Sequence, residues 1–205
     1  TGLVGDYTFE DGFKNEANTS QVGVAKALEN GFKPTILATS GRTGKVLNQN
    51  FGFADAKTTS YTQFENPLKD ASLTGATVAL WVNRNDTDVW DAIWSFFDED
   101  TTDGKDGRVY FTPNAYLGYN GTVSVNKWFD LNHANTVTNL IKEKEWHHVT
   151  VSLGTDNFGV YVDGKLVSDK TNNVTYAGTA YEDAAKDMLS VISSSANFYL
   201  GYGSW

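Results

Sequence analysis

The chain has 205 residues and carries 25 acidic against 16 basic side chains, which gives a net charge of −9 at pH 7. This length suffices for a two-layer core but is short for two domains, so we expect a single domain over residues 1–205. The negative charge opposes binding to nucleic acid or to an anionic lipid surface. The absence of Cys excludes disulfides and thiolate chemistry, and no apolar stretch approaches the roughly 20 residues of a membrane helix. We therefore expect a mature soluble segment with neither a nucleic-acid nor a membrane partner.

Short runs of β-branched and aromatic residues, separated by Gly, Asn, Asp and Thr, predict an all-β chain. In residues 76–83, Val78, Leu80 and Val82 alternate with Thr, Ala, Trp and Asn, as in a strand with one core-facing side. Residues 90–97 are apolar on nearly both faces, which is typical of a central strand covered on both sides. Further strands are expected at residues 108–111, 115–119, 122–125, 149–153 and 158–162.

Two dipeptides predict tight hairpins between these runs. Asp163-Gly164 and Asn120-Gly121 each separate two strand-like segments. Both favour the type I′ turn, whose twist matches paired antiparallel strands. Local spacing of Ala, Met and Leu predicts one or two helical turns at residues 182–189.

Three parts of the chain resemble one known family. Residues 73–82, Leu-Thr-Gly-Ala-Thr-Val-Ala-Leu-Trp-Val, are similar to a strand of the concanavalin A-like, laminin-G-like jelly rolls. Residues 145–151, Glu-Trp-His-His-Val-Thr-Val, and residues 160–167, Val-Tyr-Val-Asp-Gly-Lys-Leu-Val, resemble a characteristic strand and hairpin of that family. Residues 3–12 look like its first strand. The resemblance implies a two-sheet antiparallel β-sandwich. The family's last strand would follow residues 198–202, where this chain stops at Trp205, so the strand is missing or another segment takes its place.

A glycosidase or lyase of this fold would need carboxylates that face one groove. Residues 98–107 hold the densest acidic cluster, but they lack intervening apolar residues and are rich in Gly, which indicates an exposed loop or, alternatively, a calcium loop. His147 and His148 are adjacent on a predicted strand and face opposite sides, so they cannot converge on one atom. We expect His148 to be a hydrogen-bonded structural histidine. Residues 41–45, Gly-Arg-Thr-Gly-Lys, lack the spacing of a phosphate-binding loop. No catalytic residue is predicted.

A binding role does not require a pair of facing carboxylates, because a sugar ring is held by a flat aromatic surface and short polar groups. Trp90 and Trp128 lie near loop edges, where a Trp is less needed for packing, and each is either a ligand platform or a lid on the core. Trp81 and Trp146 lie inside the family-like strands and are expected to pack in the core or against the sheet. The predicted ligand-binding residues are Trp90, Trp128, Tyr110, Tyr116, Tyr119, Asn120, Asp130 and Arg108.

The resemblance also implies a structural calcium ion near the first strand, with Glu10 and Asn15 as oxygen-bearing candidates. The composition suits a bacterial secreted or cell-surface protein. We hypothesise a non-catalytic carbohydrate-binding module that targets an attached polysaccharide-degrading enzyme or surface protein to polysaccharide or oligosaccharide. A glycoside hydrolase or lyase of the same fold and a laminin-G-like adhesion module that binds protein are the alternatives.

Overall fold

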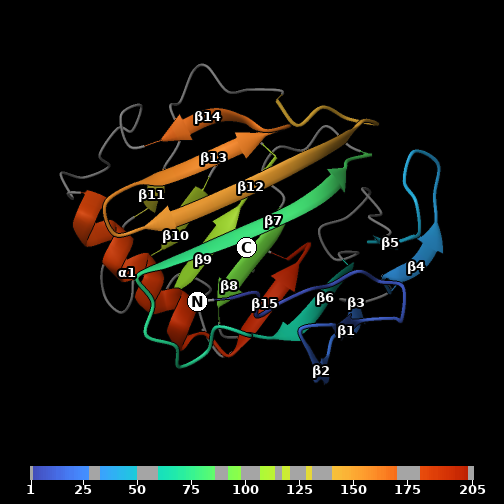
Figure 1. Ribbon diagram of the computed structural model, residues 1–205, viewed down its shortest axis with the longest axis horizontal. Coiled ribbons are helices and arrows are strands. Elements are labelled where there is room, and N and C mark those ends of the chain that lie inside the picture. The colour runs from blue at the N-terminus through green and yellow to red at the C-terminus, as the bar shows by residue number, and fades with distance from the viewer. Residues whose placement is uncertain are drawn as a thin grey trace.

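The computed structural model of the protein describes residues 2–27, 33–49, 60–85, 92–97, 107–113, 117–120, 128–130, 140–169 and 181–202. Two antiparallel sheets form its body (Figure 1). The seven-stranded sheet has the order β11-β10-β9-β8-β15-β6-β3. Its strands are β3 Val24–Ala27, β6 Ser60–Glu65, β8 Trp94–Phe97, β9 Arg108–Phe111, β10 Leu117–Asn120, β11 Trp128–Asp130 and β15 Asn197–Leu200.

The second sheet has the order β14-β13-β12-β7, and two small hairpins accompany the sandwich. The strands of the second sheet are β7 Gly75–Asn83, β12 Trp146–Gly154, β13 Phe158–Val162 and β14 Lys165–Asp169. The hairpins pair β1 Lys14–Asn15 with β2 Asn18–Val22, and β4 Thr35–Ala38 with β5 Lys45–Asn48. The antiparallel β-sandwich predicted from the sequence is confirmed. Asp163 and Gly164 both have positive φ, 51° and 77°, as the predicted type I′ turn requires. Residues 121–127 lie outside the described residues, and with them the second predicted turn and the strand expected at 122–125.

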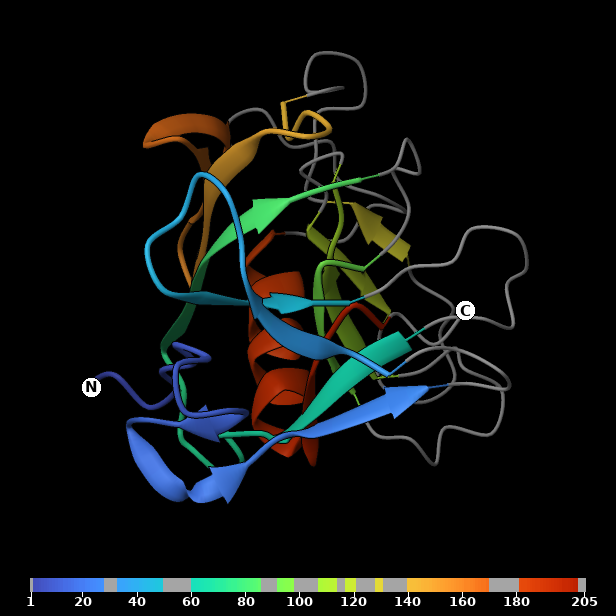
Figure 2. The same cartoon turned by 90° about the vertical axis from the view of Figure 1, so that its right-hand side faces the viewer.

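The helix α1 Tyr181–Ser194 lies between the two sheets (Figure 2). Its buried side fills the core with Ala185, Met188, Leu189 and Ile192, which recur at helical spacing. The helix extends beyond the predicted residues 182–189 because the buried stripe continues through β-branched residues, whose helix propensity is low. Core burial outweighs that preference here. Among the described residues, no helix has the length and apolar composition needed to cross a membrane.

Asn66 satisfies the C-terminal end of α1. Its amide nitrogen donates to the carbonyls of Ile192, at 2.6 Å, and Ser195, at 2.8 Å. Its side-chain oxygen accepts the amide of Leu68 at 2.9 Å. A helix leaves its last carbonyls without partners of its own, so this buried side chain joins the helix end to the loop after β6.

One side of β7 faces the core and the other is exposed, as the alternation in its sequence predicts. Val78, Leu80 and Val82 pack against the core, whereas Thr77 and Trp81 are exposed. Its partner among the described strands is β12, so β7 forms an edge of this sheet.

The prediction of a strand within residues 3–12 is wrong. Residues 2–8 have no regular secondary structure, because a side chain takes the place of a partner strand. The Oδ1 atom of Asn15 accepts the amide of Asp6 at 2.9 Å, and its Nδ2 atom donates to the carbonyl of Val4 at 2.9 Å. Tyr7 and Phe9 still pack against the core, which explains the apolar pattern that suggested a strand.

The position of α1 predicts a large cost for shortening its core side chains. Met188 is 0% exposed, so Met188→Ala leaves a cavity between the sheets and should lower the free energy of unfolding by about 2–5 kcal/mol. Lys186→Ala, on the exposed side of the same helix, is the matched control and should change it by about 0.5 kcal/mol or less. Urea denaturation measures both, and equal effects would contradict burial of the helix between the sheets.

Candidate functional site

Five of the predicted ligand-binding residues share one face of the seven-stranded sheet. The strand register places Asn120 opposite both Arg108 and Trp128. Tyr110 and Asp130 both lie opposite Gly118 of β10. Residues directly opposite each other in antiparallel strands share a face, so the sheet brings these five positions together.

The other three predicted residues do not join this group within the described structure. Tyr119 lies opposite Val109, which is fully buried in the core cluster, so its position belongs to the other side of the sheet. Trp90 and Tyr116 lie outside the described residues, as does the acidic segment 98–106.

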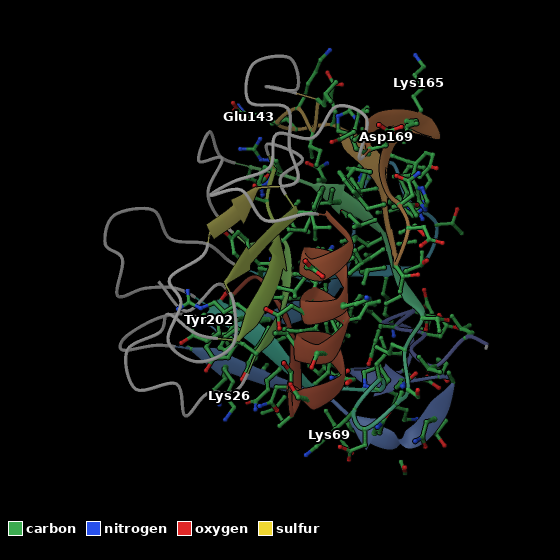
Figure 3. All side chains as sticks on the ribbon, turned by 90° about the vertical axis from the view of Figure 1, so that its left-hand side faces the viewer. Lys26, Lys69, Glu143, Lys165, Asp169 and Tyr202 are labelled. Carbon is green, nitrogen blue, oxygen red and sulfur yellow. The ribbon has the colours of Figure 1, made fainter. Side chains whose placement is uncertain are left out.

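The described side chains on this face are packed together. Arg108 is 1% exposed and Tyr110 is 5% exposed. Beside them, Tyr61 stacks on Tyr202 with ring centroids 4.2 Å apart. Figure 3 shows Tyr202 on the side of this sheet that faces away from α1. Arg108 and Tyr110 are closed to solvent in this arrangement, and a role for this face in ligand binding stays a prediction.

The outward face of the four-stranded sheet is exposed and aromatic. We call it the Trp81 face. It consists of the outward-facing residues Thr77, Ala79, Trp81, Trp146, His148, Thr150, Ser152, Tyr161 and Leu166. Trp81 is 46% exposed, Tyr161 37% and Leu166 51%, so three of the exposed large hydrophobic side chains gather on it.

Of the two positions expected for Trp81, the core is wrong, because the side chain is 46% exposed on the outer face of the sheet. The same alternation that directs Leu80 and Val82 inward directs Trp81 outward, and this signal was already present in residues 76–83. Trp146 is half-buried on the same face, where its indole N–H donates to the carbonyl of Ser40 at 3.3 Å. The packing role expected for Trp146 is confirmed.

Arg42 reaches the Trp81 face from the tip of the β4–β5 hairpin, which lies beside the end of β7 in Figure 1. Its guanidinium carbon is 4.1 Å from the centroid of the Trp81 ring and 5.8 Å from that of Trp146. The His148 ring meets Trp81 edge-on at 5.1 Å. The contact of Arg42 with Trp81 joins segments far apart in the chain, so no local pattern of residues predicts it.

Hydroxyl groups lie beside the rings on this face. The Thr77 hydroxyl donates to that of Ser152 at 3.2 Å, and Thr150 lies between Ala79 and Tyr161 in the register. Trp81 and Tyr161 are two strands and two residues apart, which corresponds to roughly 12 Å. Such a face can hold an extended ligand that presents C–H surfaces to the rings and hydroxyls to the strand side chains.

His147, not His148, is the hydrogen-bonded structural histidine. Its Nδ1 atom lies 2.8 Å from Oδ2 of Asp163, and its Nε2 atom accepts the amide of Lys142 at 3.2 Å. The partners assign the proton to Nδ1. The amide of His148 donates to Oδ1 of Asp163 at 2.9 Å, so Asp163 ties its own turn to β12. His147 is buried and His148 half-buried, on opposite sides of the strand as predicted.

The hydrogen bonds of Asp163 lead us to expect that the stability of the folded protein depends on pH. The hydrogen bond from His147, and next that from the amide of His148, hold the pKa of Asp163 below its ordinary value. A carboxylate whose pKa is lower in the folded state stabilises the fold above its unfolded pKa of about 3.9, and this stabilisation is lost as pH falls through the folded value. Asp163→Asn should therefore lower Tm between about pH 5 and 7, and the difference from wild type should narrow below about pH 4.

Calorimetry across that range measures the difference. Glu16→Gln is the control, because it removes an exposed carboxylate that makes no described side-chain hydrogen bond. A Tm difference for Asp163→Asn that stays constant down to acid pH would contradict this assignment.

Glu10 and Asn15, the calcium candidates, are engaged elsewhere. Oε1 of Glu10 accepts the amide of Lys45 at 2.7 Å. Oδ1 of Asn15 accepts two amides, those of Asp6 and Ala17, so both of its lone pairs are used. Within the described part of the chain, no group of three or more His, Asp or Glu residues is placed to hold a metal ion. The two candidates do not fit a calcium site in this arrangement, and calcium binding stays a prediction.

The hydrogen bonds of Asn15 allow a test of whether its role is to stabilise the fold or to bind calcium. Asn15 is 0% exposed, so Asn15→Ala should destabilise the protein by on the order of 2–3 kcal/mol. The loss should be the same in calcium and in EDTA, as measured by thermal melting. A loss that occurs only with calcium present would show that Asn15 ligates the ion.

Comparisons with known proteins agree with this architecture. Residues 56–201 match the family model of the concanavalin A-like lectin/glucanases superfamily. A similar solved structure is domain 4 of AbnA, a GH43 extracellular arabinanase from Geobacillus stearothermophilus, in complex with arabinotriose. The likeness has 16% sequence identity and a TM-score of 0.59, and covers 99% of this chain and 84% of the other. At this identity it shows the shared fold alone. A comparison with curated proteins found no match.

Proposed function

This chain belongs to the concanavalin A-like lectin/glucanases superfamily, and from that premise we propose that it is a non-catalytic carbohydrate-binding module whose ligand lies on the Trp81 face. The fold hosts binding modules, adhesion domains and enzymes alike, so the proposal depends on the site. The observation that carries it is the exposure of Trp81, 46%, beside a row of strand hydroxyls.

An exposed indole suits a sugar for a physical reason. The C–H groups on one face of a sugar ring pack on the flat aromatic surface, and the hydroxyls at the rim bond to short polar groups. Thr77 and Ser152 supply hydroxyls four residues along the strands from Trp81, and Tyr161 supplies a second ring. The separation of the two rings is wider than one sugar, which favours an oligosaccharide or polysaccharide chain.

The acidic groups on this face support binding over catalysis. The described strands of this sheet carry one carboxylate, Asp169, on the far edge strand β14 (Figure 3). Glycoside hydrolysis uses a pair of carboxyl groups flanking the bond. We therefore propose that hydrolysis is performed by another domain.

The biological role we propose is targeting. A module of modest affinity raises the local concentration of an attached polysaccharide-degrading enzyme or surface protein on its substrate. Such a role places the protein outside a bacterial cell, secreted or at the cell surface. The similar domain belongs to an extracellular arabinanase and was solved with arabinotriose, which supports both the location and the choice of oligosaccharides as first ligands.

Truncation of the exposed ring tests the site. Trp81→Ala should weaken retention on arabinan or other polysaccharide in affinity electrophoresis by about 30-fold, as expected for loss of a Trp hot spot worth about 2 kcal/mol. Because the ring is exposed, the free energy of unfolding should fall by about 1 kcal/mol or less. Val22→Ala, an exposed apolar residue on β2, is the control and should retain binding.

Trp128→Ala in the same experiment distinguishes the two faces. Loss of binding with Trp128→Ala and not with Trp81→Ala would move the site to the seven-stranded sheet. No retention on any glycan, together with capture of a protein partner, would favour the adhesion alternative. Release of products that depends on the acidic residues would favour the enzyme alternative.

A further inference from the structure

Arg42 is held between two anchors in the β4–β5 hairpin. On one side, the Trp146 indole donates to the carbonyl of Ser40 at 3.3 Å. On the other, the Lys45 amide donates to Glu10 at 2.7 Å. Gly41 adopts φ of +82° and has Trp146 so near that a Cβ atom would lie 3.2 Å from its ring. The backbone around Arg42 is therefore fixed before any ligand arrives, which reduces the entropy lost on binding.

The charge of Arg42 has no acidic partner within the described residues. Its described contacts are the rings of Trp81 and Trp146. Acidic side chains outnumber basic ones by 25 to 16 in the chain, so a basic group readily finds a carboxylate, as Lys14 does with Asp11 at 3.8 Å. At the Trp81 face the structure instead holds a guanidinium on aromatic surface.

Arg42 is partly exposed and makes no hydrogen bond within the described residues, so its N–H groups can reach a ligand. A guanidinium stacks on a ring through its flat face, whereas its five N–H groups point outward in its own plane. Two of these N–H groups match the two oxygens of a carboxylate in a bidentate pair. The rings hold the orientation of the guanidinium, and Trp81 itself remains 46% exposed for contact with the sugar.

We propose that the Trp81 face prefers glycans that carry carboxylate groups, that is, uronic acid residues, and that Arg42 binds the carboxylate. This inference rests on the proposed function and adds the ligand class. A neutral sugar stacked on Trp81 gains only ordinary hydrogen bonds from Arg42. A uronic acid in the same position gains a charge-assisted bidentate pair.

The negative net charge of the protein does not oppose this contact strongly. At physiological ionic strength the Debye length is about 8 Å, so acidic groups on other surfaces are screened from a ligand on this face. Arg42 touches the ring on which the ligand would lie, at 4.1 Å, and is therefore inside that distance. The preference between acidic and neutral glycans therefore depends on Arg42, the cationic side chain beside Trp81.

The test uses one oligosaccharide in two charge states. Oligogalacturonate and its fully methyl-esterified form share a backbone and differ in the carboxylate. Isothermal titration calorimetry of the full chain should show at least about tenfold tighter binding of the acid form to wild type. Arg42→Gln should bring the ratio of the two affinities close to one, and Arg42→Lys should restore only part of the preference because Lys cannot form the bidentate pair. Trp81→Ala should weaken both forms, and the acid form more, because the Trp81 ring also orients the guanidinium of Arg42.

Several results would overturn the inference. Equal affinity of wild type for both forms would do so, as would an Arg42→Gln variant that loses both forms equally, since Arg42 would then only support the Trp81 ring. Dextran sulfate binding as tightly as oligogalacturonate would overturn the carboxylate preference in favour of charge alone. Thermal melting of each variant confirms that it is folded. Binding of neutral arabino-oligosaccharide through Trp81 without any preference for uronic acid would overturn this inference and leave the proposed function standing, whereas no binding of any glycan would overturn the proposed function itself.

Discussion

The pairing of β7 with β12 is the constraint on which both the core and the candidate site depend. The two strands stay in register over nine residues, from Trp146 opposite Asn83 to Gly154 opposite Gly75. Side chains alternate along a strand, so this register places one row of Val and Leu in the core and the other row at the surface. A slip of one residue would exchange the rows, exposing Val149 and burying the face that carries a Trp, a His and hydroxyl groups. The packing of the core and the shape of the outer face are therefore set by the same register.

The two sheets present different outer faces for reasons of packing. On the seven-stranded sheet, the rings of Tyr61, Phe97, Tyr199 and Tyr202 pack against one another and are largely removed from water. On the four-stranded sheet, the outward residues next to Trp81 along β7 and across on β12 are small or polar apart from Trp146, so Trp81 stays 46% exposed. Aromatic content by itself therefore does not identify a binding face. The binding face is proposed from the exposed fraction of each ring in the company of hydroxyl groups.

The hairpin that carries Arg42 shows how a small element can define a surface. β4 and β5 pair only with each other among the described strands, so this hairpin belongs to neither large sheet. Side chains join it to the rest of the fold, through Trp146 of β12 on one side and Glu10 of the N-terminal segment on the other. These contacts bring residues from the first quarter of the chain onto a face built from its middle. Family membership accounts for the sandwich, and this hairpin adds the guanidinium of Arg42 to its face.

The sequence by itself determined the strands with strict alternation and the Asp163-Gly164 turn, because these depend on local periodicity and on backbone conformations that few residues adopt. It also contained the outward position of Trp81, although the expectation that a Trp is buried obscured it. Only the tertiary structure decided that residues 2–8 are held by the side chain of Asn15 and that a helix fills the core. It alone brought Arg42 onto Trp81. These features arise from contacts between segments far apart in the chain, and no local pattern of residues records which distant surface a side chain will meet.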